Sequence, residues 1–269
     1  MENKTKYTDC IPKDFWKMTL EDCHAKDFLD AYSILARGFW CCENKIQEGK
    51  LLLTGINPSY SGEHYGNDRI KTRRFADLAP LDKKNGFWKK KEQQFGGLWN
   101  DDTMSYLDLF PIRESNQRLF EQVFKNPKLT KLRADILSIT QDAIEEMKPR
   151  LIIHANRASL YYWGLVPETP WMGYSFELVD PGKYEDFPKS IMTSEHLRLF
   201  PFYRITGFSP HPERINQEKF PTSEKSSLVG SFFMEYVMEY RKKEDRDKMY
   251  DKDDWAEIWK WVKKHSQND

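Results

Sequence analysis

The chain has 269 residues, 39% of them hydrophobic and 14% aromatic, which is enough for one large α/β domain with a substantial core. Its 42 basic side chains equal its 42 acidic ones, so the net charge indicates no nucleic-acid partner, and such a partner would need a local patch. The start of the chain, Met1–Tyr7, leads into no apolar signal region, and no run approaches the roughly 20 apolar residues of a membrane span. We therefore expect a soluble, cytoplasmic protein that has no membrane partner and acts as a monomer.

The four cysteines fit no zinc-binding spacing, and two of them, Cys41 and Cys42, are adjacent, an arrangement that rarely forms a disulfide. Cys10 and Cys23 lie well before this pair. We interpret all four as reduced, buried thiols rather than as ligands of an iron–sulfur cluster. We accordingly expect neither a metal nor another cofactor.

The first part of the chain predicts a helix, two strands and a long connection. Residues 27–40 have helical apolar spacing, and Lys50–Gly55 is a short apolar run typical of a buried strand. A sharp turn follows at Gly55–Ser59, where a proline prevents the strand from continuing. Residues 60–103 have no clean periodicity, which indicates a functional loop or a small insertion, and Ser105–Phe110 is the second strand.

The second part predicts alternating helices and strands. Thr130–Met147 is an amphipathic helix that Pro149 ends, and a strand follows at Arg150–Ala155. The remaining predicted elements are a short helix at Arg157–Trp163 closed by Gly164, strand and loop at 171–195, a strand at Phe202–Phe208, a helix at about 223–243, and a final helix at Asp254–Lys264. The final helix carries an apolar stripe that we expect to dock on the core, made of Trp255, Ile258, Trp259 and Val262.

This alternation predicts a parallel sheet with helices on both faces. In such sheets ligands bind beyond the carboxyl ends of the strands. Asn57, Asp108, His154 and His211 each end or follow a predicted strand, so we expect all four at one edge of the sheet. We assign residues 1–245 to this domain and residues 246–269 to a charged linker and the docking helix.

Two short motifs give the chain a resemblance to the uracil-DNA glycosylase superfamily. Gly55-Ile56-Asn57-Pro58-Ser59 is similar to the first family motif, most of all in the mismatch-specific and single-strand-selective branches, with Ser59 in place of a glycine. Ser209–Asn216 is similar to the second motif, with Glu213 in place of a serine, and Lys148–Ile153 resembles the helix end and strand before it. The resemblance covers about residues 50–220, and it implies a three-layer α/β/α sandwich with a small, mostly parallel central sheet.

The resemblance also implies an enzyme that hydrolyses the N-glycosidic bond of a flipped-out uracil or other damaged base in DNA. Asn57 would position the attacking water, and His211 would donate a hydrogen bond to the departing base, where negative charge develops. Gly55, Ile56 and Pro58 would line the base pocket. An asparagine before a proline is also a common turn residue, and a histidine in a proline-rich loop is often ordinary, so both residues have a structural alternative.

Asp108 departs from the family at the residue that reads the base, where relatives have asparagine. An ionised aspartate only accepts hydrogen bonds, whereas uracil presents both a donor and an acceptor. Three interpretations stay open: Asp108 is held protonated, the substrate is not simple uracil, or catalysis has been lost. Burial in a pocket would raise its pKa, because desolvation disfavours the charged form. The alternative without function is a solvent-facing aspartate at a strand end.

A basic stretch rich in aromatic residues follows the first motif. Ser61–Asn100 contains nine basic and five acidic residues, interleaved with five Phe and Trp side chains. Cations for phosphates and rings for bases are the usual ingredients of single-strand binding. We expect a base-stacking ring at Tyr65 or Phe75, and DNA contacts from Ser59, Lys89, Lys90, Lys91, Pro212, Arg214 and Asn216. The alternative is a solvated lysine-rich loop whose rings lie in the core.

Two other functions stay open. The departures from the family at Ser59, Glu213 and Asp108 favour a non-catalytic nucleic-acid-binding member of the same fold. A hydrolase of small nucleotides at the same edge of the sheet is a weaker alternative. The sequence contains no nucleophile elbow and no phosphate-cradling loop followed by Lys-Ser/Thr, and no histidine pair has metal-binding spacing.

Overall fold

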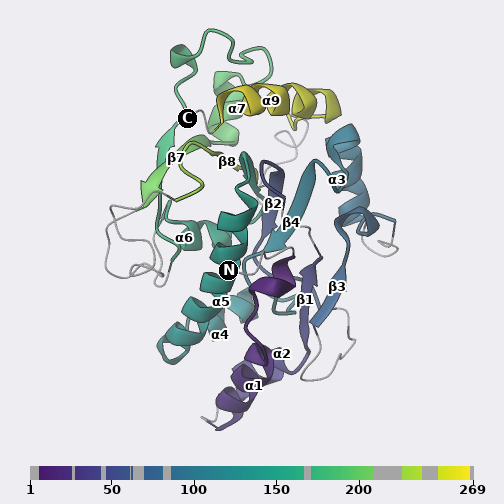
Figure 1. The fold of residues 1–269 in the computed structure, drawn as a ribbon, viewed down its shortest axis with the longest axis vertical. Helices are drawn as coiled ribbons and strands as arrows, with labels where there is room; N and C mark the ends of the chain where they lie inside the picture. The colour runs from purple at the N-terminus through teal and green to yellow at the C-terminus, as the bar shows by residue number, and fades with distance from the viewer. Residues whose placement is uncertain are drawn as a thin grey trace.

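Figure 1 shows the computed structural model, which describes residues 6–25, 28–43, 47–60, 62, 70–80, 86–166, 171–208, 226–237 and 248–266. A six-stranded sheet in the order β4-β2-β5-β8-β7-β6 runs through the molecule. Its strands are β2 (Leu51–Gly55), β4 (Met104–Asp108), β5 (Leu151–His154), β6 (Tyr174–Leu178), β7 (Phe202–Phe208) and β8 (Phe232–Glu235). β4, β2, β5 and β8 are parallel, and β7 and β6 continue the sheet in antiparallel pairing. The chain is therefore an α/β protein with a mostly parallel sheet.

Two further parallel strands, β1 (Phe39–Cys42) and β3 (Ile70–Arg73), lie on the β4 side of the sheet (Figure 1). The backbone N–H of Trp40 donates to the carbonyl of Pro111 at 3.0 Å, and Phe39 forms a single bridge with Ile112. These bonds join β1 to the loop that leaves β4.

Helices cover both faces of the six-stranded sheet and form two cores. On one face lie α1 (Phe15–Ala25), α2 (Leu29–Leu35), α4 (Gln117–Phe124), α5 (Thr130–Met147) and α6 (Leu160–Trp163). On the other lie α3 (Phe87–Phe95), α7 (Ser194–Leu199) and α9 (Lys252–His265). The described 3-10 turns are Tyr7–Cys10, Phe75–Asp77, Gly96–Leu98, Pro127–Leu129, Arg157–Ser159 and Pro181–Lys183.

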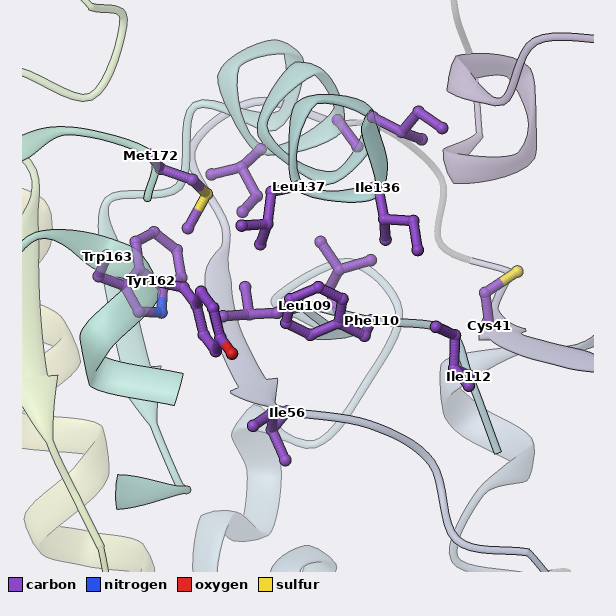
Figure 2. Packing of buried hydrophobic residues seen from close by; sticks show 14 of the residues in the cluster. Cys41, Ile56, Leu109, Phe110, Ile112, Ile136, Leu137, Tyr162, Trp163 and Met172 are labelled. Atoms are coloured by element: carbon purple, nitrogen blue, oxygen red, sulfur yellow. The ribbon is translucent and has the colours of Figure 1, made fainter. Parts of the chain in front are cut away.

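Alternate residues of each strand supply the two cores, as the pleat of a strand requires. In β2, Leu52 faces the α5 core, whereas Leu51 and Leu53 face the α9 core. Figure 2 shows Ile136 and Leu137 of α5 pointing toward Leu109 and Phe110, which follow β4. Because helices cover both faces of the sheet, we look for a ligand site at the ends of the strands.

Several predicted elements are confirmed. The helix at Thr130–Met147 has the bounds that its spacing predicts, and it ends because Lys148 adopts a left-handed backbone (φ 42°) before Pro149. β2, β4, β5 and β7 occupy the predicted strand positions. The apolar stripe of α9 is buried, so this helix docks on the core as expected.

Three segments were predicted wrongly. The helix expected at 27–40 ends at Leu35, because Gly38 (φ 80°) turns the chain into β1. The stretch 60–103, expected to be a functional loop or a small insertion, contains β3 and α3, so the loop alternative is wrong. The helix expected at about 223–243 is replaced over its described central part by β8, whose Phe232 and Phe233 face opposite cores, so that its unbroken apolar run does not reveal a strand period.

The direction of β7 also differs from expectation. β7 pairs antiparallel with β8, so its last residue, Phe208, lies at the opposite edge of the sheet from Gly55 and Asp108. The strand that precedes His211 therefore does not lead to the edge where we expected that residue. His211 itself lies outside the described residues.

No helix in the described part of the chain is long and apolar enough to cross a membrane. The four cysteines are buried and form no disulfide. Burial raises the pKa of the Cys41 thiol to about 12, so this thiol is unreactive at neutral pH.

Candidate functional site

The first motif and the expected base reader lie side by side at the carboxyl ends of β2 and β4. The two strands pair in register, with Gly55 opposite Asp108. The loops that leave them stay joined, because Phe110 N–H donates to Ile56 O at 2.8 Å and Glu114 N–H donates to Pro58 O at 3.0 Å. The sequence-based placement of Asn57 and Asp108 at one edge is thus correct.

The amide of Asn57 holds these two loops together. Its Nδ2 donates to the backbone carbonyls of Glu114 at 2.7 Å, Ile112 at 3.2 Å and Pro58 at 3.2 Å. Three carbonyl acceptors around one NH₂ group fix the side chain in place. The amide nitrogen of Asn57 is therefore engaged in structure, and only its oxygen is left for a water molecule.

Asp108 is buried, with 5% of its surface exposed, so the alternative of a solvent-facing aspartate is wrong. Tyr106 donates its hydroxyl to Oδ1 at 2.6 Å, while Oδ2 is buried and accepts no hydrogen bond from any described residue. Desolvation raises the pKa of Asp108 to about 7, against the opposing effect of the Tyr106 hydrogen bond. The expected direction of this shift is confirmed, so the Asp108 carboxyl keeps its proton to a higher pH than an ordinary aspartate does.

Gly55 is required where the Asp108 side chain crosses β2. A Cβ at this position would lie 2.5 Å from the Tyr106 hydroxyl oxygen and would collide with Oδ1 of Asp108. The glycine of the first motif therefore makes room for the Tyr106–Asp108 pair.

Aromatic rings surround Tyr106 on the α3 side of the sheet. Trp88, half-buried at the start of α3, meets the Tyr106 ring edge to face at 4.7 Å, and Trp40 of β1 lies 6.4 Å from it. Sequence reasoning missed Tyr106, although the two-residue spacing from Asp108 puts both side chains on one face of the strand.

His154 ends β5 at the same edge, but it belongs to the core. The ring is fully buried, contacts Thr54 Oγ1 at 3.2 Å and Ser159 Oγ at 2.9 Å, and lies close to the carbonyl of Asn156. Burial lowers its pKa to about 3, so the ring is neutral at physiological pH. Its role is to pack β5 against its neighbours.

A second polar cluster fixes the end of the first motif. Two guanidinium groups lie against the ring of Tyr60, with Arg37 4.7 Å and Arg113 5.3 Å from its centroid. Arg37 also forms an ion pair with Glu114, and Ser115 Oγ bonds both the N–H and the carbonyl of Tyr60. No local sequence signal links these residues, because they come from three separate parts of the chain.

Three expected site residues have other roles. Phe75 is 1% exposed and packs against Trp99 at 4.4 Å, so it is not available to stack on a base. The side chain of Ile56 lies in the α5 core (Figure 2). Lys91 is buried, with Nζ 5.6 Å from the centroid of the Tyr236 ring, and so offers no surface contact.

The remaining expected contacts divide into two groups. Ser59, Lys89 and Lys90 are exposed, as DNA contacts would need, while Pro58 is buried and its carbonyl joins the loops. The other predicted site residues lie outside the described part of the chain: Tyr65, His211, Pro212, Arg214 and Asn216.

A pocket of about 150 Å³ lies at the other edge of the sheet, at the start of β4. Ser105, Met104 and Phe75 form part of its wall. Three of its charged groups already have ionic partners, since Lys6 pairs with Glu43 and Arg74 pairs with Asp77 at 2.9 Å. We therefore place the candidate site at the Gly55–Asp108 edge and not in this pocket.

Comparisons with known proteins assign no family to this chain. No protein-family model, no curated protein and no solved structure matched it. The chemistry of the Gly55–Asp108 edge is therefore argued from its own residues and from the two short motifs.

Proposed function

We propose that the chain is an N-glycosyl hydrolase that releases a flipped-out uracil or another damaged base from DNA at the Gly55–Asp108 edge. The observation that carries the proposal is the register of β2 and β4, which places a buried carboxyl directly beside the turn that resembles the first glycosylase motif. Helices on both faces of a mostly parallel sheet are consistent with the uracil-DNA glycosylase-like sandwich that this proposal includes.

The reaction needs a positioned water and a hydrogen-bond donor to the base, and residues of this chain can supply both. Breaking the N-glycosidic bond leaves a cationic sugar and an anionic base, so the site must hold a water at the sugar and donate to the base. In the proposal Asn57 Oδ1 accepts from the water, and Asp108 contacts the base edge and donates to it when protonated. His211 is left out of the proposed site, because β7 leads toward the opposite ends of the strands. Lys89, Lys90 and Ser59 supply exposed contacts to the DNA backbone.

The proposal requires an opening beside Asp108. Because only 5% of this residue is exposed, a base reaches Oδ2 only if neighbouring side chains part. Asp108 Oδ2 is buried and has no described hydrogen-bond partner, so a hydrogen bond to the base edge would stabilise the opened state.

Single-turnover assays test the proposal. The substrates are oligonucleotides with uracil, hypoxanthine, xanthine or 5-hydroxymethyluracil, each single-stranded and mispaired, and the product is an abasic site. We expect abasic product from at least one substrate and its loss in Asn57→Ala, with binding retained. If no substrate gives product and none is bound, the proposal is wrong.

A second candidate function is a non-catalytic nucleic-acid-binding protein of the same fold. The three carbonyl acceptors around Asn57 Nδ2 favour it, because they account for the motif asparagine without catalysis. Intact binding of the same oligonucleotides without any abasic product would select this alternative.

A further inference from the structure

Tyr106 and Asp108 form a fixed pair on one face of β4. The Tyr106 hydroxyl donates to Oδ1 of Asp108 at 2.6 Å, and both side chains lie against Gly55, where even a methyl group would collide with them. The Tyr106 ring is itself held by Trp88 at 4.7 Å. The carboxyl therefore has one orientation, set by its neighbours.

In this orientation one carboxyl oxygen of Asp108 is hydrogen-bonded and the other has no partner among the described residues. Oδ1 is engaged by Tyr106, while Oδ2 is buried and accepts no hydrogen bond from the described residues. A buried polar atom without a partner is rare and unfavourable in a folded protein, so it points to a ligand that supplies the missing bond.

We propose that Tyr106 is the positioning residue that sets base specificity: it holds Oδ1 of Asp108, so that Oδ2 alone meets the base and, when protonated, donates to a carbonyl oxygen of a keto base. This inference rests on the proposed function and names the substrate class of the same edge. A carboxyl fixed in this way reads one group, in contrast to an asparagine, which presents a donor and an acceptor together.

The surroundings of the carboxyl favour the neutral form and hence the keto base. Burial is the larger influence on the Asp108 pKa, and the entry of a base would remove still more water. The other titratable groups that feel the Asp108 charge are Cys41 and Cys42 on β1 and Tyr7 at the start of the chain. Burial raises the pKa of each, so all three are neutral near pH 7.

The decisive variant is Tyr106→Phe, which keeps the ring and removes the hydroxyl. The Tyr106 hydrogen bond stabilises the carboxylate, so its loss should raise the Asp108 titration midpoint by about one pH unit. The midpoint is read from the ¹³Cγ signal of labelled aspartate, which Asp108→Asn identifies. Tyr174→Phe is the matched control, because Tyr174 donates to a different buried carboxylate, Glu145, at 3.0 Å; it should leave the midpoint unchanged.

The same signal, followed in the wild-type protein with free uracil or free cytosine, tests the base class without requiring bond cleavage. A carbonyl bonded to Oδ2–H stabilises the neutral acid, so uracil, with two carbonyls and no amine, should raise the midpoint more than cytosine, whose amine favours the ionised form. An unchanged midpoint in Tyr106→Phe, or with uracil, overturns the inference even if the enzyme cleaves DNA. Shifts in both arms without any abasic product support the inference and reject glycosidic cleavage.

Discussion

The side-chain amide of Asn57 has two ends with different tasks. Nδ2 donates to three backbone carbonyls from the loops that follow β2 and β4, and the shortest of these bonds, to Glu114, is 2.7 Å. Oδ1 accepts no bond from the residues that the structure describes, so it is the atom with which a water molecule can interact. A substitution that removes the Nδ2 donor but keeps an acceptor oxygen therefore separates the structural role of Asn57, joining the two loops, from its proposed role in holding a water.

We expect Asn57→Ala and Asn57→Asp both to lower the free energy of unfolding by about 1–3 kcal/mol, because each removes the amide donor from the carbonyls of Ile112 and Glu114, while Pro58 O keeps the Glu114 N–H. Asp should be at least as harmful, since its carboxylate faces the same carbonyl oxygens. Urea denaturation gives the stability, and single-turnover cleavage gives the rate. If Asn57→Asp keeps wild-type stability, the clamp is wrong; if it keeps the rate while Asn57→Ala loses it, the acceptor role is supported.

For single residues, the sequence predicts the direction of a pKa shift better than it predicts hydrogen-bond partners. The raised pKa of Asp108 follows from a carboxyl at the end of a buried strand, and the structure confirms its direction. The partners of Asn57 were not predictable, because Ile112 and Glu114 lie more than 50 residues further along the chain. Tyr106 was within reach, since the alternation of β4 puts it beside Asp108.

The helix α3 shows why the stretch 60–103 has no evident period. Its buried positions include Lys91, whose aliphatic stem packs among rings while Nζ lies 5.9 Å from the centroid of Phe87 and 5.6 Å from that of Tyr236. A lysine in an apolar position breaks the hydrophobic pattern of an amphipathic helix. Lys89 and Lys90, on the exposed side, are the basic residues that a nucleic acid can meet.

For α3 we expect a division of roles among its three lysines. Converting Lys89 and Lys90 together to Ala should weaken binding to all oligonucleotides alike and reduce the slope of log K against log salt by about 1.4 for single strands, since each phosphate contact contributes about 0.7. Lys91→Ala should instead lower stability and leave the slope unchanged. Fluorescence anisotropy at several salt concentrations measures the slope.

The control for this test is the pair Lys13 and Lys17, which are exposed near and on α1 and carry the same charge. Their conversion to Ala changes the net charge equally, so it should have less effect on the slope if α3 is the contact. Equal slopes for the two double variants would return α3 to the role of solvated surface.

The pairing of β7 and β8 was beyond sequence reasoning for a different reason. The strand character of Phe202–Phe208 is visible in its residues, but its direction depends on the strand beside it. That strand, β8, is apolar on both faces, so its residues give no period that distinguishes it from a buried helix. The existence of β7 was therefore predictable, and its direction in the sheet was not.

Across the whole molecule, two buried titratable groups of opposite kind lie at the carboxyl ends of β4 and β5, on either side of β2. Asp108 has its pKa raised from 3.8 to about 7 by burial, and His154 has its pKa lowered from 6.5 to about 3 by burial. The contribution of Asp108 to stability is full below pH 3.8 and is lost as pH rises toward 7. The contribution of His154 is full above pH 6.5 and is lost as pH falls toward 3.

Between pH 3.8 and 6.5 these two effects oppose each other. In that range the unfolded chain holds the His154 proton and the folded chain holds the Asp108 proton, so the number of bound protons is the same and the two slopes cancel. Removing one group should therefore expose the pH dependence of the other.

We expect Asp108→Asn to reveal this compensation. The free energy of unfolding of the variant, relative to the wild type, should rise by about 1.4 kcal/mol per pH unit between 3.8 and about 7, and then stay constant. Urea denaturation from pH 4.5 to 8.5 measures it, with Asp135→Asn as a control, because Asp135 is a surface carboxylate paired with Lys131 on α5. A difference that does not vary with pH would mean that the Asp108 carboxyl ionises alike in the folded and unfolded chain. The desolvated acid on which both proposals rest would then be absent. If instead the variant loses stability in acid while the wild type does not, the opposing pH effects of Asp108 and His154 are supported.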